Sequence, residues 1–359
     1  MLIKCLLEPQ STLRLAERDW HLVLLQARRH GLLAKLEARL SGLQLIGSAP
    51  YKARSHLHAA RIAALSTQTA VRFEVNRVLR ALRGRVEPIV LMKGAAYVHA
   101  GLAPAAGRFV GDVDLMVPRV RIGEVERHLL EAGWEGAQLD AYDQRYYREW
   151  THEIPPMQHP ERDTPVDIHH TIAALTSRVH PDASAILSAC VALPGSGLHV
   201  MAPADMVLHS AVHLFNDEVG LPLRDLFDLH DLLLQFGVEP GFWDELLARA
   251  QLHGLQRVLY HMLRQTRRQL GTPVPESVST EVAAWAPGSA VGALMDVLFG
   301  QHFAVDPPQG PTATRRRAAS ALYLRAHWLR MPTGMLVRHL AVKSWKRWRE
   351  RDEAAENPV

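Results

Sequence analysis

Apolar residues recur three or four positions apart through the first part of the chain. Between residues 13 and 41 this spacing is interrupted only by the pair His30-Gly31, which predicts two helices separated by a break. A longer pattern of the same kind runs from Tyr51 to Arg83 and stops at Gly84, a residue that commonly ends helices. We therefore expect a helical N-terminal region that packs on the elements that follow.

Short apolar runs bounded by proline and glycine replace this pattern after residue 85. Residues 88–92 predict a buried strand, and a helix is expected to begin near Ala95. Residues 112–117 predict a second strand, and residues 152–159 and 165–170 predict the two arms of a hairpin. These runs predict a small mixed β-sheet.

Helical spacing returns at Pro203 and continues to residue 268. Residues 306–311 are rich in proline and predict a linker. Two further helices are expected beyond it, one near residues 318–329 and one that ends near Arg349. The whole pattern predicts an α+β fold, with a small mixed sheet between N-terminal and C-terminal helical regions.

These changes of pattern divide the chain into five parts. We expect an N-terminal helical region (1–85), an α/β core (86–175), a helical domain that packs on the core (176–270), a segment rich in linkers (271–311) and basic amphipathic helices (312–359).

Composition narrows the class of protein. Apolar residues make up 48% and charged residues 22%, which is typical of a globular protein that can bury a full core. No run approaches the roughly 18–20 uninterrupted apolar residues of a membrane span. The apolar stretch at the N-terminus is too short for a signal peptide and is interrupted early by an acidic residue. Because Cys5 and Cys190 are the only two cysteines, a disulfide framework and a thiolate zinc site are both excluded. We expect a cytoplasmic protein.

The net charge of +4 conceals an uneven distribution. Residues 315–349 carry ten Lys or Arg and no Asp or Glu, and subtracting this +10 leaves −6 for the rest of the chain. A basic amphipathic segment can rest on an anionic membrane, contact a protein or nucleic acid, or dock its tryptophans on the core. The core shows no charge balance typical of nucleic-acid binding. A membrane-peripheral location and a protein contact through 315–349 therefore both stay open.

Asp112 and Asp114 carry the strongest chemical signal in the chain. Side chains alternate along a strand, so these two carboxylates point to the same face. Neighbouring carboxylates repel each other, which raises the pKa of each unless a cation or solvent compensates. Because the surrounding run is apolar, we expect a divalent cation rather than a solvated strand end. Asp167, an acid inside another β-branched run, is the natural third carboxylate.

Lys93 and Gly94 follow the first predicted strand directly. At a strand-to-helix turn, backbone N–H groups and an ammonium can point at a phosphate. Glycine is also common at such turns for purely conformational reasons. The pair gains weight from the acids that follow it.

His209 and His213 lie one helical turn apart on a predicted helix. This spacing occurs in zinc sites, but the glutamate of a metalloprotease helix is missing. We expect both histidines to pack against neighbouring elements.

Residues 91–170 resemble the DNA polymerase β-like nucleotidyltransferase superfamily. The closer likeness is to its bacterial "uncharacterised nucleotidyltransferase" branch, whose members often accompany polysaccharide-biosynthesis genes, and it covers roughly residues 15–235. The residues that carry it are Leu91-Met92-Lys93-Gly94, Arg108, Asp112-Val113-Asp114-Leu115 and Val166-Asp167-Ile168-His169. Better-known members have Gly-Ser at the turn, whereas Lys93-Gly94-Ala95 is closer to the Lys-Gly-Gly turn of the abortive-infection toxin relatives.

The resemblance implies a palm-like core that moves an NMP from an NTP to a hydroxyl acceptor. Asp112, Asp114 and Asp167 would be the catalytic residues and would bind two Mg²⁺ ions, or Mn²⁺, with Asp167 nearest the acceptor as general base.

Lys93, Gly94 and Arg108 would then bind the NTP phosphates. The acceptor can be a small molecule or sugar, a protein side chain or an RNA 3′ end. The alternative is a non-catalytic nucleotide-binding or scaffold protein, toxin-like or attached to a membrane through its basic tail.

Overall fold

The computed structural model describes residues 1–217, 220–338 and 345, and a long helix organises its N-terminal half. The predicted break at His30-Gly31 is confirmed, because it separates α2 from α3. The N-terminal helices are α1 (Leu2–Leu7), α2 (Glu17–Arg29), α3 (Leu33–Gly42) and α4 (Tyr51–Leu82).

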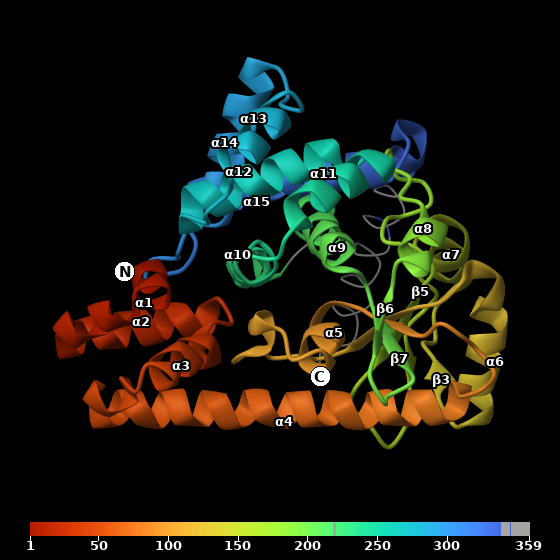
Figure 1. Ribbon diagram of the computed structural model, residues 1–359, viewed down its shortest axis with the longest axis horizontal. Coiled ribbons are helices and arrows are strands. Elements are labelled where there is room, and N and C mark those ends of the chain that lie inside the picture. The colour runs from red at the N-terminus through yellow and green to blue at the C-terminus, as the bar shows by residue number, and fades with distance from the viewer. Residues whose placement is uncertain (218–219, 339–344, 346–359) are drawn as a thin grey trace.

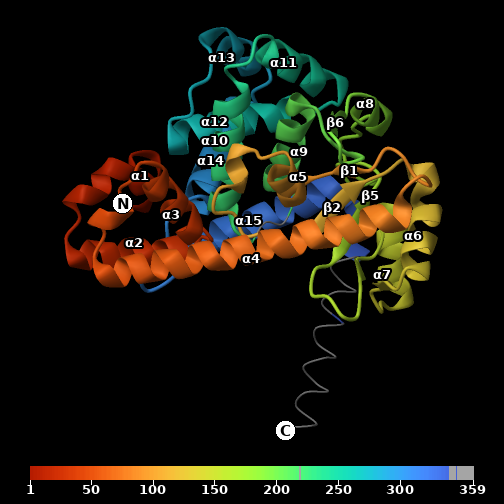
Figure 2. The same cartoon turned by 60° about the horizontal axis from the view of Figure 1, so that its bottom comes forward.

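Helix α4 connects the N-terminal helices to the sheet. It is 32 residues long, which corresponds to about 48 Å. One end packs on α3, and the other packs on α5 (Lys93–His99), α6 (Ile122–Glu131) and strand β2 (Val113–Met116) (Figures 1 and 2). The long helix predicted from residues 51–83 is confirmed, and it gives the sheet a rigid support.

The predicted mixed sheet is confirmed and, among the residues that the structure describes, has seven strands in the order β3-β4-β5-β2-β1-β7-β6. The pairs β2–β5 and β1–β7 are parallel, whereas the others are antiparallel. The strands are β1 (Val90–Leu91), β2 (Val113–Met116), β3 (Glu135–Gly136), β4 (Met157–Gln158), β5 (Val166–His169), β6 (Val191–Leu193) and β7 (Leu198–Val200).

The register of β2 and β5 sets which side chains meet. Asp114 lies directly opposite Asp167 in this parallel pair. The predicted hairpin is also confirmed, because β4 pairs with β5 in antiparallel fashion and an isolated bridge places Glu153 opposite His169. Since side chains alternate along a strand, Asp167 and His169 share one face with Asp114. The intervening residues Val113, Leu115, Val166 and Ile168 are fully buried.

Helix α9 (Pro203–Asn216) is the centre of the C-terminal helical region. It contacts α10 (Pro222–Phe236), α11 (Phe242–Leu252), α12 (Gln256–Leu270) and α15 (Ala313–Arg330), which gather around it in Figure 1. Further helices in the described part of the chain are α7 (Ala141–Arg145), α8 (Ala183–Ser188), α13 (Glu276–Ala283) and α14 (Ser289–His302). Short 3₁₀ turns cover Pro9–Arg14, Ile46–Ser48, Ala103–Ala105 and Arg119–Arg121, and a π turn covers Tyr146–Trp150.

Residues 271–311, expected to be rich in linkers, contain two helices. Both α13 and α14 are anchored by buried side chains, of which Val282 and Phe299 are 4% and 2% exposed. Proline and serine therefore mark the joints between these helices rather than one continuous linker. The division of the chain into five parts stays a prediction.

The first half of the basic C-terminal segment folds into α15. Its cations are partly used inside the fold, since Arg315 pairs with Asp306 and Arg325 donates a hydrogen bond to the carbonyl of Phe215. The second predicted helix, ending near Arg349, lies largely outside the described residues. A membrane or protein contact through 315–349 therefore stays a prediction. Within the described ranges, no helix combines the length and apolar character needed to cross a bilayer.

Burial of His261 is expected to make the helical region sensitive to acid. This α12 residue is 4% exposed, and burial together with Arg325 lowers its pKa to about 3. The folded chain keeps the ring neutral, whereas the unfolded chain protonates it near pH 6.5. The stability that His261 contributes is therefore present above about pH 6.5 and is lost as the pH falls towards 3.

We expect His261 to remove about 2 kcal/mol of stability between pH 7.5 and pH 5. Replacing it with glutamine, which does not titrate, should reduce the pH dependence of the unfolding free energy by that amount. Denaturant unfolding at the two pH values measures this, with exposed His58→Gln as the control. An unchanged slope in His261→Gln would contradict the expectation.

Candidate functional site

The three carboxylates predicted as metal ligands lie together at β2 and β5. One oxygen of each of Asp112, Asp114 and Asp167 lies within 4.8 Å of the other two, so the three form a group that could hold a metal ion. Asp114 is 2% exposed, and the other two are half-buried. The adjacency expected from strand alternation therefore holds in three dimensions.

The carboxylates of this group have very different proton affinities. Burial and the charge of Asp114 raise the pKa of Asp112. Burial, Asp114 and Glu153 raise the pKa of Asp167 to about 7. Burial by itself would raise the pKa of Asp114, but Lys93 and the hydrogen-bonded His169 hold this pKa well below its usual range.

The donor set fits a hard divalent cation. Asp167 Oδ1 is buried and has no hydrogen-bond partner, and Asp112 and Asp114 present further carboxylate oxygens beside it. Oxygen ligands of this kind suit Mg²⁺, and a bound cation would compensate the repulsion that raises the pKa values. Asp112, Asp114 and Asp167 would hold the ion.

Lys93 stands beside the carboxylates at the start of α5. Its ammonium Nζ donates a hydrogen bond of 2.8 Å to Asp114 Oδ1, and its side chain is 20% exposed. Its backbone has a φ of +44°, a conformation that costs a residue other than glycine roughly 1–3 kcal/mol. The fold therefore keeps Lys93 in a strained conformation with its charge at the cluster.

Gly94 lies where α5 approaches the segment before β2. A Cβ atom at this position would lie 2.6 Å from Val110 Cγ1, so a larger residue would collide with Val110. Close packing thus explains the glycine by itself. The predicted contact between the Gly94 N–H group and a phosphate stays a prediction.

Arg108 is held by two acids of α10. Its guanidinium donates to Asp228, lies 3.6 Å from Asp225 Oδ1 and sits 5.6 Å from the ring centre of Tyr97. These carboxylates balance its charge. The predicted contact between Arg108 and the triphosphate stays a prediction, and any such contact would share the guanidinium with α10.

His169 and Glu153 are neighbours of the site to which we gave no role from the sequence, although His169 ends the Val166-Asp167-Ile168-His169 stretch. His169 Nε2 donates to Asp114 Oδ1 over 2.9 Å, and His169 Nδ1 lies 3.3 Å from Glu153 Oε2. Two sequence signals could have found them. Alternation puts Asp167 and His169 on one face, and the predicted hairpin places Glu153 across from His169.

The two α9 histidines differ in their surroundings. His209 is 3% exposed, as expected for a packing residue, and burial, followed by Lys93, lowers its pKa well below the usual range. His213 is partly exposed and its Nδ1 lies 3.8 Å from Asp217 Oδ2. Among the described residues, neither belongs to a group that could hold a metal ion.

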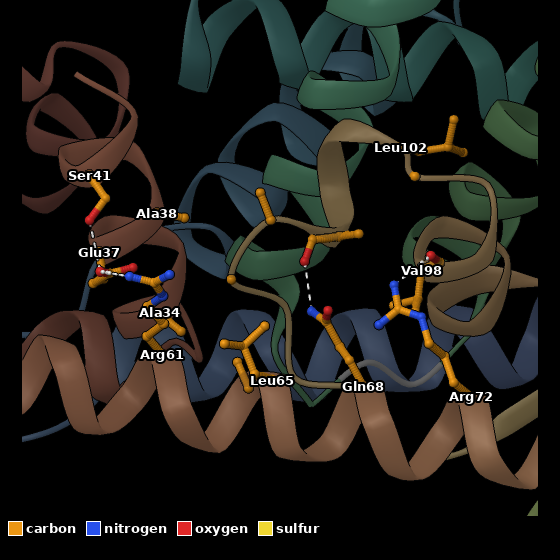
Figure 3. A pocket seen from close by; sticks show the side chains of 15 residues that line it. Ala34, Glu37, Ala38, Ser41, Arg61, Leu65, Gln68, Arg72, Val98 and Leu102 are labelled. Carbon is orange, nitrogen blue, oxygen red and sulfur yellow. Dashed lines mark hydrogen bonds and ion pairs between the residues drawn. The ribbon is translucent and has the colours of Figure 1, made fainter. Parts of the chain in front are cut away.

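A cavity of about 470 Å³ lies away from these residues, between α3, α4 and the segment after α5 (Figure 3). Its polar side chains already have partners. Arg61 lies 3.6 Å from Glu37, and Gln68 donates to the carbonyls of Ala105 and Arg108. None of the aspartates of the cluster lines it. The cavity is therefore a poor candidate for the reaction centre.

Comparison with known proteins places the chain in a family. No curated protein matches it. The model of the family described as "Uncharacterised nucleotidyltransferase" matches residues 16–271, well over half of the chain. The sequence resemblance is thereby confirmed at the level of the family. With this match, and with its aspartates brought together as the resemblance implied, the chain belongs to the uncharacterised nucleotidyltransferase family.

Proposed function

We propose that the protein is a Mg²⁺-dependent nucleotidyltransferase that moves an NMP from an NTP to a hydroxyl acceptor. The observation that carries the proposal is the meeting of Asp112, Asp114 and Asp167 within 4.8 Å, with the Lys93 ammonium beside them. Membership of a nucleotidyltransferase family supports transferase activity.

In the proposed reaction the acceptor oxygen bonds to the α-phosphorus of the NTP. The bond from this phosphorus to the β-phosphate oxygen breaks, and pyrophosphate leaves with the electron pair. Mg²⁺, when bound, would stabilise the negative charge that develops on the phosphates. The acceptor proton goes to a nearby base, and Asp167, which the resemblance places nearest the acceptor, is the carboxylate proposed for this role.

The other residues orient and balance charge. His169 and Lys93 both donate to Oδ1 of Asp114, which orients the carboxylate for binding a cation. Lys93 also supplies a positive charge that a triphosphate can approach, since its side chain is partly exposed.

We expect Mg²⁺-dependent binding of at least one NTP by the wild type. Isothermal calorimetry with each of the four NTPs, with and without Mg²⁺, measures this binding and shows which NTP is preferred. Asp112→Asn should lose the binding, because it removes a ligand of the ion that holds the triphosphate. Asp163→Asn, an exposed acid in the hairpin turn, should bind as the wild type does. Failure of a well-folded wild type to bind any NTP would sink the proposal.

A transfer assay identifies the acceptor class and also tests the non-catalytic alternative. An NTP labelled on the α-phosphate is incubated with small-molecule, protein and RNA fractions, and the fraction that gains label identifies the acceptor class. A sugar or sugar phosphate is the acceptor that fits the predicted polysaccharide-associated branch. Binding of NTP without transfer to any fraction would instead favour a non-catalytic nucleotide-binding or scaffold protein.

A further inference from the structure

Next to the aspartate cluster, we propose a second and chemically different metal site, formed by His152, Glu153 and His169, that takes a transition-metal ion of the Zn²⁺ class. One ligand atom from each of the three residues lies within 4.8 Å of the other two. The site adjoins the aspartate cluster through His169 but shares no ligand with it.

The backbone brings these side chains together without any local sequence motif for metal binding. Glu153 and His169 are direct partners across the antiparallel bridge between the hairpin arms, so their side chains leave the same face. The ring of His152 stacks on that of His169, with centroids 5.2 Å apart and planes at 26°. The hairpin arms thus bring two imidazoles and one carboxylate together.

The spacing of the ligand atoms fits a bound ion. His169 Nδ1 lies 3.3 Å from Glu153 Oε2, and His152 Nε2 lies 3.8 Å from the same oxygen. Tetrahedral zinc has bonds of about 2.0–2.2 Å to nitrogen and oxygen, which places neighbouring ligand atoms about 3.4 Å apart. Small side-chain adjustments would therefore complete the site.

A buried ring nitrogen that makes no hydrogen bond points to a ligand as well. His169 is fully buried, and its Nδ1 has no hydrogen-bond partner, while its Nε2 donates to Asp114. A metal-bound histidine typically donates its other ring N–H to a carboxylate, which orients the ring. His169 has this arrangement, with Nδ1 facing the Glu153 carboxylate, which would be a second ligand of the same ion.

The two sites differ in the ion that they favour. Three carboxylates suit Mg²⁺, whereas two imidazole nitrogens and one carboxylate oxygen suit Zn²⁺ and similar ions. An ion bound to His169 would fix its ring and hence the carboxylate of Asp114 that its Nε2 holds. The second ion is therefore expected to position Asp114 rather than to contact the NTP.

The test measures metal content rather than activity. The full chain is stripped with EDTA, dialysed against Zn²⁺ and then against metal-free buffer, and its zinc is determined by mass spectrometry. We expect about one retained equivalent in the wild type, in Asp112→Asn and in His58→Ala, an exposed histidine control. His152→Ala should lose most of this zinc, since loss of even an outer-shell partner weakens metal binding about 10–100-fold.

Glu153→Gln provides a second variant if His152→Ala does not fold, and circular dichroism checks the fold of each protein. Loss of zinc from folded Glu153→Gln alone also supports the site. The proposal is overturned if the folded wild type retains no zinc, if both ligand variants retain it, or if Asp112→Asn loses it. Absence of Mg²⁺-dependent NTP binding with zinc still retained would count against the proposed function only.

Discussion

Asp112→Asn and Asp114→Asn are expected to reduce nucleotidyl transfer alike, yet only Asp114→Asn is expected to destabilise the metal-free protein. Each substitution removes a charged ligand of the proposed Mg²⁺ site. We expect transfer to fall at least about 10³-fold, which corresponds to about 4 kcal/mol of transition-state stabilisation. Activity alone would therefore not distinguish the two carboxylates.

Stability distinguishes them because their partners differ. The pKa of Asp112 is raised by burial and by Asp114, so a neutral side chain relieves repulsion and should leave the metal-free protein as stable or more stable. Asp114 is buried and holds Lys93 and His169. Its replacement leaves the Lys93 ammonium without that carboxylate, a loss that costs about 3–5 kcal/mol for a buried pair.

Denaturant unfolding in EDTA at pH 8, together with the labelled-NTP assay, measures both effects. Asp163→Asn serves as the matched control, because it makes the same change at an exposed position. Equal destabilisation by the two variants would show that Asp114 has no special structural role. Full transfer activity in either would contradict the assignment of the cluster.

Local pattern was enough to predict the parts of this site that lie on one face of the sheet. Alternation along residues 112–117 and the β-branched run around Asp167 gave the three carboxylates, since a strand has only two faces. The predicted hairpin contained the pairing of Glu153 with His169, although we drew no conclusion from it. Because side chains alternate with a period of two residues along a strand, the sequence itself shows which of them share a face.

The surroundings of Arg108 could not be predicted in the same way. Its partners Asp225 and Asp228 lie on α10, more than a hundred residues further along the chain. Periodicity reports which face of an element is buried, but the packing of distant elements decides which charge meets which. The helices within residues 271–311 were missed for a related reason, because their anchors, such as Phe299, become visible only against α9.

Lys35→Met is expected to lower the free energy of unfolding by about 3 kcal/mol or more. Lys35 is 2% exposed, and its Nζ lies 2.6 Å from Asp231 Oδ2 and 3.4 Å from Asp228 Oδ1. Arg39 also pairs with Asp231. Methionine fills a similar volume but leaves two buried carboxylates to share the remaining cations.

The matched control is Lys52→Met, which removes an exposed lysine from α4 and should change stability by less than about 0.5 kcal/mol. Adding Asp231→Asn to Lys35→Met should recover part of the loss, because it removes one of the uncompensated charges.

The same change should also reach the candidate site through Asp228. This carboxylate contacts both Lys35 and Arg108. Losing Lys35 removes one of these two cations, so Asp228 holds the Arg108 guanidinium more firmly to α10. If the Arg108 guanidinium contacts both α10 and the triphosphate, Lys35→Met should weaken Mg²⁺-dependent NTP binding, whereas Lys52→Met should not. Unchanged NTP affinity in a folded but destabilised Lys35→Met would confine Arg108 to a structural role. Unchanged stability would show that Arg39 and Arg108 already compensate the charges of Asp231 and Asp228 without Lys35.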